Sequence, residues 1–435
     1  MFSKLSVDLK WRGKILHCVF ASLHWKDMQQ QELIPHLFRK EFRKITSVLC
    51  KHLGIDHIET AEDIVSDTFL QAVETWSYKG IPENPTAWLY TVAKNKARNL
   101  LQRNLIFNDK ITRELIISSE AQGNEIDLSD RNIQDSQLQM LFALCHPCIS
   151  TEAQIGLSLR ILCGFGIDEI ADAFLTNKET INKRLFRAKE KLRTEKVTIE
   201  FPDQREISNR LENVLTTLYL LFSEGYYSES QDNVLRKDLC LEAMRLTKLL
   251  VENEQTNKPS VNALLSLMCF HSSRFEARID ERGEMILYRD QDESLWNQEL
   301  IEKGLYFFHQ ASLGDTISKY HIEAGIAYWH TIKADTKEKW ESIVLLYDRL
   351  LQIQHTPIAA LNRTYAFSKA KGKEAAILEA RKLKLEDNHF YFMLLGELYK
   401  DVDNNKSKEN FQKALELAKT KTDKQTIETH LTQLT

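Results

Sequence analysis

The chain has 435 residues, of which 43% are hydrophobic and 28% charged, and its formal net charge is −4 at pH 7. This is the composition of an ordinary soluble globular protein, and the length predicts two or three domains. No apolar run approaches the length of a membrane-spanning helix, so we expect no membrane partner. The seven scattered cysteines form no disulfide framework, which favours a reduced, cytoplasmic protein.

Residues 1–27 do not look like the beginning of a domain. Their apolar segment, Ile15 to Trp25, contains two histidines and makes a poor signal-peptide core. Met28 follows, and a polar run then leads into an amphipathic helix expected over Leu33 to Leu53. We therefore expect Met28 to be the true start.

A second helix is expected over Ala61 to Trp76, because apolar residues recur there at i, i+3 and i+4 and give a strong core face. The other side of this helix is a mostly acidic stripe, the "acidic stripe" below, formed by Asp63, Asp67, Gln71 and Glu74. A stripe of this kind is usually solvated surface, and only the neighbouring segment suggests a further role.

Helix breakers between Gly80 and Pro85 precede the third expected helix. Asn84 can cap this helix, and Pro85 suits its first turn because the amide that proline lacks would be unpaired there anyway. One side of the helix, the "aromatic face" below, carries Trp88, Thr91, Lys94, Asn95 and Arg98. This combination suits unpaired nucleic acid, because an aromatic ring can stack on bases while nearby cations bind phosphates. The alternative is that Trp88 packs into the core at the helix edge.

Residues 105–135 are predicted to be a linker, because they are polar and acidic on balance and have too little apolar surface to fold alone. Farther along, Cys145 and Cys148 have the C-x-x-C spacing of metal ligands and redox pairs. No second such pair and no paired histidine lies nearby. We therefore expect these cysteines to be structural, and we expect no metal or other cofactor.

The stretch from Ile167 to Arg193 predicts two short helices around a corner that holds Leu175. Thr176 and Glu179 form a capping box at the start of the second helix, whose apolar stripe faces the first. Outside that stripe lies a "basic face" that comprises Lys178, Thr180, Lys183, Arg184 and Arg187. This is the helix-turn-helix pattern, whose second helix enters the major groove of DNA. The alternative is a solvated, lysine-rich surface helix.

Beyond Pro202 the sequence predicts long amphipathic helices to the end, apart from a hairpin over Phe275 to Arg289 that turns at Arg282-Gly283. The helices that begin near Trp340 and Phe392 resemble the tetratricopeptide pattern, although they are not separated by a multiple of the usual period of about 34 residues. We therefore predict an all-α fold that ends in an irregular, tetratricopeptide-like helical array. Such arrays normally offer a concave surface to a protein or peptide.

In order and spacing, the segments AEDIVSDTFLQA, AWLYTVAKNKARNLLQR and IDEIADAF…TINKRLFRAKEKLR resemble regions 2 and 4 of bacterial RNA polymerase sigma factors of the extracytoplasmic-function group. The segments EGYYSES, DQDESLW and ALNRTYA are similar to those of a subgroup with a helical extension behind region 4. The resemblance implies a region 2 domain over 28–104, the linker over 105–135, a region 4 domain over 136–197 and the extension over 205–435.

The resemblance also implies a function without catalysis, in which the protein binds core RNA polymerase, recognises promoter DNA and promotes its melting. By the same resemblance, the acidic stripe faces the clamp of the polymerase, the aromatic face meets the −10 element, and the helix from Asn177 reads the −35 element. The extension would regulate or support the factor, through a protein partner or signal that acts on it.

Two other classes of function are compatible with parts of the sequence. A conventional regulator of duplex DNA could use the helical array as its sensor, but it would need neither the acidic stripe nor the aromatic face. An enzyme housed in the array could bind a metal at Asp290, Asp292 and Glu293. No histidine, nucleophile or phosphate-binding loop accompanies these carboxylates, which more simply cap the helix that follows.

Overall fold

The computed structural model describes residues 26–108, 126–174, 176–226, 237–278, 286, 288–418 and 420–434. In those ranges every regular element is a helix, which confirms the predicted all-α class. Four features of the sequence analysis lie outside the described residues: the segment before Lys26, Leu175 at the corner, most of the EGYYSES segment and the Arg282-Gly283 turn. None of the helices within these ranges is long and apolar enough to cross a membrane.

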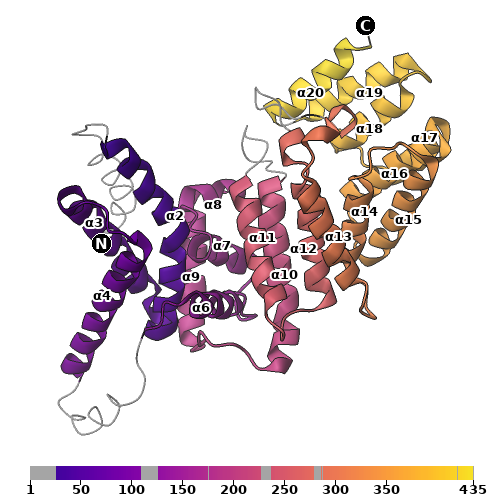
Figure 1. Ribbon diagram of the computed structural model, residues 1–435. Coiled ribbons are helices and arrows are strands. Elements are labelled where there is room, and N and C mark those ends of the chain that lie inside the picture. The colour runs from indigo at the N-terminus through magenta and orange to yellow at the C-terminus, as the bar shows by residue number, and fades with distance from the viewer. Residues whose placement is uncertain are drawn as a thin grey trace. The chain divides into compact units, whose positions relative to one another are not determined.

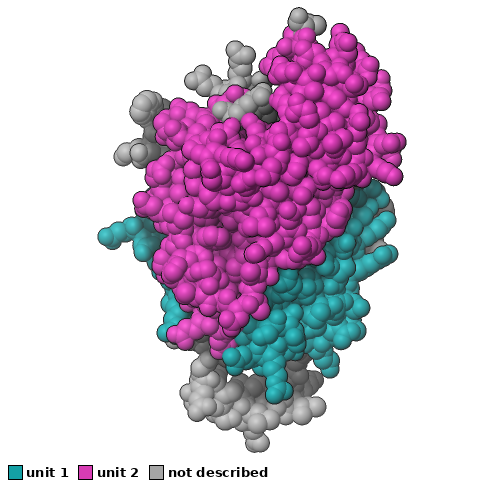
Figure 2. All heavy atoms as spheres, turned by 90° about the vertical axis from the view of Figure 1, so that its right-hand side faces the viewer, with its two compact units in different colours: residues 1–217 teal, residues 218–435 magenta. Residues whose placement is uncertain are grey.

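The chain divides into two compact units, residues 1–217 and 218–435, which Figure 2 colours separately. The boundary falls within one long helix, α10 (Gln204–Tyr226), so that its first part belongs to one unit and its last part to the other.

The first unit begins with α2 (Lys26–Leu53), η1 (Ile55–His57), α3 (Ile58–Lys79) and α4 (Pro85–Asn108), which pack on one another (Figure 1). The start of α4 is as predicted: the amide of Ala87 donates to the side-chain oxygen of Asn84 over 3.0 Å, and Pro85 is the first helical residue. Apolar side chains from all three long helices, such as Leu49, Phe69 and Leu89, are buried between them.

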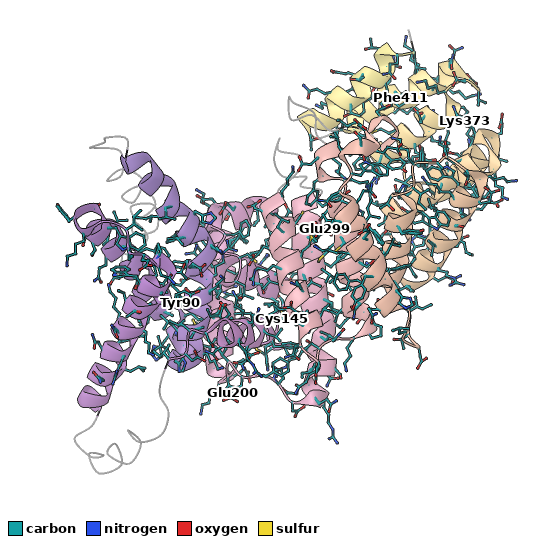
Figure 3. The ribbon with its side chains drawn as sticks, in the orientation of Figure 1. Tyr90, Cys145, Glu200, Glu299, Lys373 and Phe411 are labelled. Atoms are coloured by element: carbon teal, nitrogen blue, oxygen red, sulfur yellow. The ribbon has the colours of Figure 1, made fainter. Side chains whose placement is uncertain are left out.

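A buried polar contact fixes the position of α4 on α2. The hydroxyl of Tyr90 donates to the carboxylate of Glu41 over 2.6 Å, and Lys44 forms an ion pair with the same carboxylate at 3.1 Å (Figure 3). Glu41 is almost completely buried, so an unpaired charge there would be costly, and both partners offset that cost. The contact holds Tyr90 inward, which leaves the opposite side of α4 toward solvent.

The first unit continues with α6 (Asp130–Leu144), α7 (Thr151–Ile161), α8 (Ile167–Ala173) and α9 (Lys178–Thr194). Both ends of the expected linker, residues 105–108 and 130–135, are helical, in α4 and α6, and residues 109–125 lie outside the described residues. The hydroxyl of Ser129 caps α6, and the helix buries the polar side chains of Ser136 and Gln137 along with its apolar ones. The acidic residues Asp130 and Asp135 lie in this helix, and their contribution to the acidic composition extended the expected linker to residue 135.

The two short helices predicted over Ile167 to Arg193 are present as α8 and α9, but the predicted capping box is wrong. The side chain of Asn177, not Thr176, caps α9 by accepting from the amide of Thr180 over 2.8 Å. Glu179 points to solvent instead of reaching back to the cap. The predicted apolar stripe of α9 is confirmed, because all its members are buried: Ile181, Leu185, Ala188 and Leu192.

Close packing of α9 on α7 depends on a glycine. A Cβ atom at Gly156 would lie 2.9 Å from a methyl carbon of Leu185, which is closer than such atoms approach in proteins. The absence of a side chain at this position therefore leaves room for Leu185 of α9 against α7.

The second unit contains the end of α10 and then α11 (Lys237–Glu252), α12 (Pro259–Ser272), α13 (Gln298–Ala311), α14 (Lys319–Trp329), α15 (Lys337–Ile353), α16 (Pro357–Lys371), α17 (Lys373–Leu383), α18 (His389–Tyr399), α19 (Asn404–Leu417) and α20 (Lys421–Thr432). From α11 onward, each of these helices packs against the next one in the chain (Figure 1). Gly396 on α18 meets the ring of Phe411 on α19, where a Cβ would lie 2.8 Å from ring carbons.

The described part of the expected hairpin contains no strand. Its flanks form short 3-10 helices, η2 (Phe275–Ala277) and η3 (Tyr288–Asp290), and a third one, η4 (Glu293–Leu295), follows. One backbone hydrogen bond joins the two flanks, from the amide of Ile286 to the carbonyl of Arg278 over 2.7 Å.

Candidate functional site

The basic face of α9 forms one wall of a cleft of about 470 Å³. The start of α7 and the residues before it form the other wall. The lining comprises Cys148, Ile149, Ser150, Ala153, Thr180, Lys183, Arg184, Arg187, Ala188 and Lys191. Four of the five predicted residues of the basic face thus meet in one concave surface, and Lys191 adds a further cation to it.

The cations of the basic face differ in how firmly they are held. The guanidinium of Arg184 lies 5.4 Å over the ring of Phe174, which fixes its direction. Lys183 is 71% exposed, and its ion pair with Glu179 is a loose one at 4.0 Å. Lys178 does not line the cleft and forms an ion pair with Asp168 on α8 at 2.6 Å. Lys183 and Arg187, which is also exposed, are therefore the cations best placed to reach a ligand.

The opposite wall of the cleft adds groups that the sequence analysis missed. Ser150 caps α7 by accepting from the amide of Ala153 over 3.4 Å, and both residues line the cleft. A helix N-terminus carries partial positive charge, which favours anions. The signal in the sequence is Ser150 followed by Glu152, a pattern typical of a helix start.

An exposed aromatic residue on α9 was also missed. Phe186 is 63% exposed, although a phenylalanine on a packed helix normally points inward. It directly follows Leu185 and so lies off the apolar stripe, and this break in the pattern could have identified it. It adds an apolar group to the surface that also carries Asn182.

Two other cations of α9 pair with the first helices of the chain. Lys189 forms an ion pair with Glu59 on α3, and Arg193 forms one with Asp56 on η1 at 3.3 Å. Burial would raise the pKa of Glu59, but the hydrogen bond and the charge of Lys189 outweigh it and hold that pKa below its usual value. This side of α9 is thus occupied within the protein, unlike the side that lines the cleft.

The aromatic face of α4 is only partly exposed. Trp88 is half-buried and meets Trp76 edge-on, with ring centroids 5.4 Å apart, so the core-packing alternative is partly realised. Thr91, Asn95 and Arg98 are exposed, and Lys94 is half-buried. The ring therefore has one face held by the core while the polar members of the set remain accessible.

A second hollow, of about 600 Å³, lies beside this face and is lined by Ala87, Tyr90, Thr91, Lys94, Ile126, Asp127 and Leu128. It brings together Thr91 and Lys94 but not Trp88, Asn95 or Arg98. Hydrogen bonds from Ser129 chiefly, and the charges of Lys94 and Lys51 to a smaller extent, hold the pKa of Asp127 below its usual value.

The acidic stripe lies on the solvent side of α3. Asp63, Asp67 and Glu74 are exposed and Gln71 is half-buried. The ammonium of Lys96 on α4 donates to the backbone carbonyl of Asp67 over 3.0 Å, which leaves the Asp67 carboxylate to point outward. Three of the four members of the stripe are thus exposed carboxylates on one helix.

The two cysteines of the C-x-x-C pair are in different environments. Cys145 is buried, with its sulfur 3.6 Å from the hydroxyl of Thr217, and burial raises its pKa to about 11. Cys148 is half-buried at the edge of the cleft, and burial raises its pKa too. Both thiols are thus held neutral, while metal ligation and nucleophilic attack require the thiolate. The described residues contain no group of three or more potential metal ligands.

The carboxylate cluster after α12 has a local structural role. Asp292 caps η4 by accepting from the amide of Ser294 over 2.9 Å, and Asn297 caps α13. The capping interpretation of Asp292 is therefore confirmed, although the helix that it caps is the short η4.

Comparisons with known proteins agree with this geometry. A family model described as sigma-70 region 2 matches residues 37–105, and one described as a family of unknown function (DUF6596) matches residues 210–312. An uncharacterized protein of Rhizobium meliloti (strain 1021), R00370, is 32% identical over 354 residues, which cover 80% of this chain and 83% of the relative. No solved structure matches the chain.

Proposed function

Because the chain belongs to a sigma-factor family, we propose that it binds core RNA polymerase, recognises the −10 and −35 elements of promoters and promotes their melting. The sigma-70 region 2 match carries this proposal, since it covers α2 after its first turns, α3 and nearly all of α4. The two surfaces that the proposal needs, the acidic stripe and the aromatic face, lie on those helices.

In this proposal the acidic stripe binds the polymerase. The exposed carboxylates of Asp63, Asp67 and Glu74 are opposite in charge to a basic partner surface, and charge complementarity mainly sets the rate and specificity of docking. The aromatic face binds the −10 element, where Trp88 stacks on an unpaired base while Lys94 and Arg98 contact phosphates.

The basic cleft reads the −35 element. Lys183 and Arg187 project from a helix of the length and cationic character that enters a major groove, and the start of α7 supplies amides for a phosphate. We assign these DNA contacts to Lys183 and Arg187 because both side chains are exposed and line the same cleft.

We further propose that the protein belongs to the extracytoplasmic-function group and that its extension is a tetratricopeptide-like array. Paired helices such as α15 with α16 and α18 with α19, and the glycine-to-ring contact of Gly396 with Phe411, support that assignment. The extension would support region 4, because the first part of α10 packs in the first unit, where Thr217 contacts Cys145.

The second candidate is a regulator that binds duplex DNA without polymerase. The basic cleft fits both candidates, but only a sigma factor uses the acidic stripe. The test is co-purification of the full chain with core RNA polymerase, comparing the wild type with Asp63→Lys/Asp67→Lys. Glu83→Lys/Glu200→Lys is the matched control, because it makes the same change of charge at exposed residues off the stripe.

We expect the stripe variant to lose polymerase binding while its unfolding free energy changes by no more than about 0.5 kcal/mol per substitution, because both residues are exposed. The control variant should bind as the wild type does. Undiminished binding of polymerase by the stripe variant would contradict the assignment of the stripe, and absence of binding by the wild type would favour the regulator.

A further inference from the structure

The second unit contains a buried group of cations around one tyrosine, the "Tyr288 cluster", whose members are Arg274, Tyr288, Trp296, His330 and Lys339. They come from the segment after α12, from η3, from the residue after η4, and from the end of α14 and the start of α15. The hydroxyl of Tyr288 donates to the carbonyl of Ile332 over 3.1 Å and accepts from the ammonium of Lys339 over 2.9 Å.

The cations surround the ring of Tyr288. The guanidinium of Arg274 lies 5.4 Å from its centroid, and the ammonium groups of Lys339 and Lys333 lie 5.1 Å and 5.5 Å away. Arg274 is only 6% exposed and Lys339 only 1%. Contacts between a cation and a ring stabilise charge, but far less than a carboxylate would in the same place.

Arg274 has no carboxylate partner among the described residues. Its guanidinium donates one long hydrogen bond, 3.4 Å to the hydroxyl of Tyr226, and its Nε has no acceptor among the described residues. Lys339 donates to two neutral oxygens, those of Tyr288 and Ile332. A buried charge without an opposite charge is costly, so proteins keep such groups where a ligand compensates them.

The acids around the cluster are exposed. The charges of Asp335 and Glu293 both act on Tyr288, and both side chains face solvent. The carboxylate of Asp335 also accepts from the indole of Trp340 and forms an ion pair with Lys369 at 3.5 Å. Burial, with the charges of Arg274 and Lys339, lowers the pKa of His330 to about 3, so this ring is neutral. Arg274 and Lys339 are thus buried cations whose neighbouring acids lie at the surface.

We propose that the Tyr288 cluster binds a small oxyanion, a ligand that carries a phosphate or carboxylate group. Arg274 offers a planar pair of donors that matches such a group, and Lys339 offers an ammonium. The indole nitrogen of Trp296 is buried and has no acceptor in the structure, so it adds a neutral donor.

When the ligand binds, the cations give up their weak contacts with the Tyr288 ring and donate hydrogen bonds to the oxygens of the ligand. Tyr288 and Lys333 are half-exposed, so the cluster borders solvent at these two residues. This proposal goes beyond the proposed function and does not depend on it, because it assigns to the extension a ligand of its own.

The test is a thermal unfolding titration of the full chain with sodium phosphate, sodium citrate or sodium chloride at matched ionic strength. Binding to the folded state raises the unfolding midpoint as ligand concentration rises. We expect phosphate or citrate to raise it more than chloride does, and the more effective of the two identifies the class of ligand.

Arg274→Met should weaken the apparent affinity by about tenfold or more, because a charge-assisted hydrogen bond is lost. Arg349→Met is the matched control, since Arg349 is exposed in the same unit, and it should bind as the wild type does. If Arg274→Met does not fold, Lys339→Met provides a second variant, which removes the ammonium proposed to bind the ligand and should also bind it more weakly. A wild type that responds equally to all three salts would overturn the proposal, as would variants of the cluster that keep the full response.

Discussion

Replacing Lys183 and Arg187 by alanine removes two cations from the basic cleft without breaking a buried contact. Lys183 is 71% exposed and has only its loose ion pair with Glu179, and Arg187 is exposed. Each substitution should therefore change the unfolding free energy by no more than about 0.5 kcal/mol. Any larger loss of DNA binding then reflects lost contacts with DNA and not a damaged fold.

The expected magnitude depends on what each cation contacts. A side chain that reads a base contributes about 1–3 kcal/mol, so its loss weakens binding by about 5- to 150-fold and relaxes specificity at one position. A cation that contacts only a phosphate lowers affinity uniformly across sequences and reduces the slope of log K against log salt by about 0.9. Fluorescence anisotropy with promoter and scrambled duplexes at several salt concentrations separates these two outcomes.

The matched control removes two cations from another side of the same helix, as Lys189→Ala/Arg193→Ala. Those residues pair with Glu59 and Asp56, so their loss should leave the preference for promoter over scrambled DNA unchanged. The reasoning is refuted if the cleft variant keeps its preference for promoter DNA and its salt slope, or if the control variant loses that preference to the same extent.

Three further results are expected. Trp88→Ala should reduce promoter opening, measured by permanganate reactivity of unpaired thymines, because base stacking contributes about 1–3 kcal/mol per base, and normal opening would contradict a role for the ring. Glu59→Gln/Asp56→Asn should strengthen duplex binding by the free chain in an anisotropy titration, because Lys189 and Arg193 lose their partners. An unchanged affinity would show that these ion pairs do not compete with DNA. Burial raises the pKa of Glu323 to about 7, so between about pH 4.5 and pH 7 the folded state keeps a proton that the unfolded state releases. The wild type should therefore lose stability as the pH rises through that window, whereas Glu323→Gln should not. Denaturation midpoints of the two proteins that run parallel from pH 5 to 8 would exclude this role of Glu323.

The elements whose signals are local could be predicted from the sequence. Apolar spacing identified α3 and α9, and the pair Asn84-Pro85 identified the start of α4. The cap of α9 could not be fixed in this way, because Thr176 and Asn177 are adjacent and both can accept from a helix-start amide. The choice between them depends on the path of the corner, which neighbouring helices determine.

Contacts between distant residues left no signal in the sequence. Lys189 and Glu59 are 130 residues apart, and nothing local marks them as partners. Lys339 lies in an amphipathic helix and looks like any solvated lysine, yet it is buried because η3 and the end of α14 cover it. The basic cleft was half predicted for the same reason: α9 was recognised, but the wall that α7 supplies depends on tertiary packing.

Run-off transcription distinguishes a sigma factor from a regulator that only binds duplex DNA. Core RNA polymerase would be mixed with the full chain on a template pool with randomised −35 and −10 elements, and transcripts would be sequenced. We expect transcripts that start at a selected promoter only when the chain is added, and their loss with Asp63→Lys/Asp67→Lys. If initiation does not depend on the chain, while the chain still binds duplex DNA in the presence of the same polymerase, the protein is not a sigma factor.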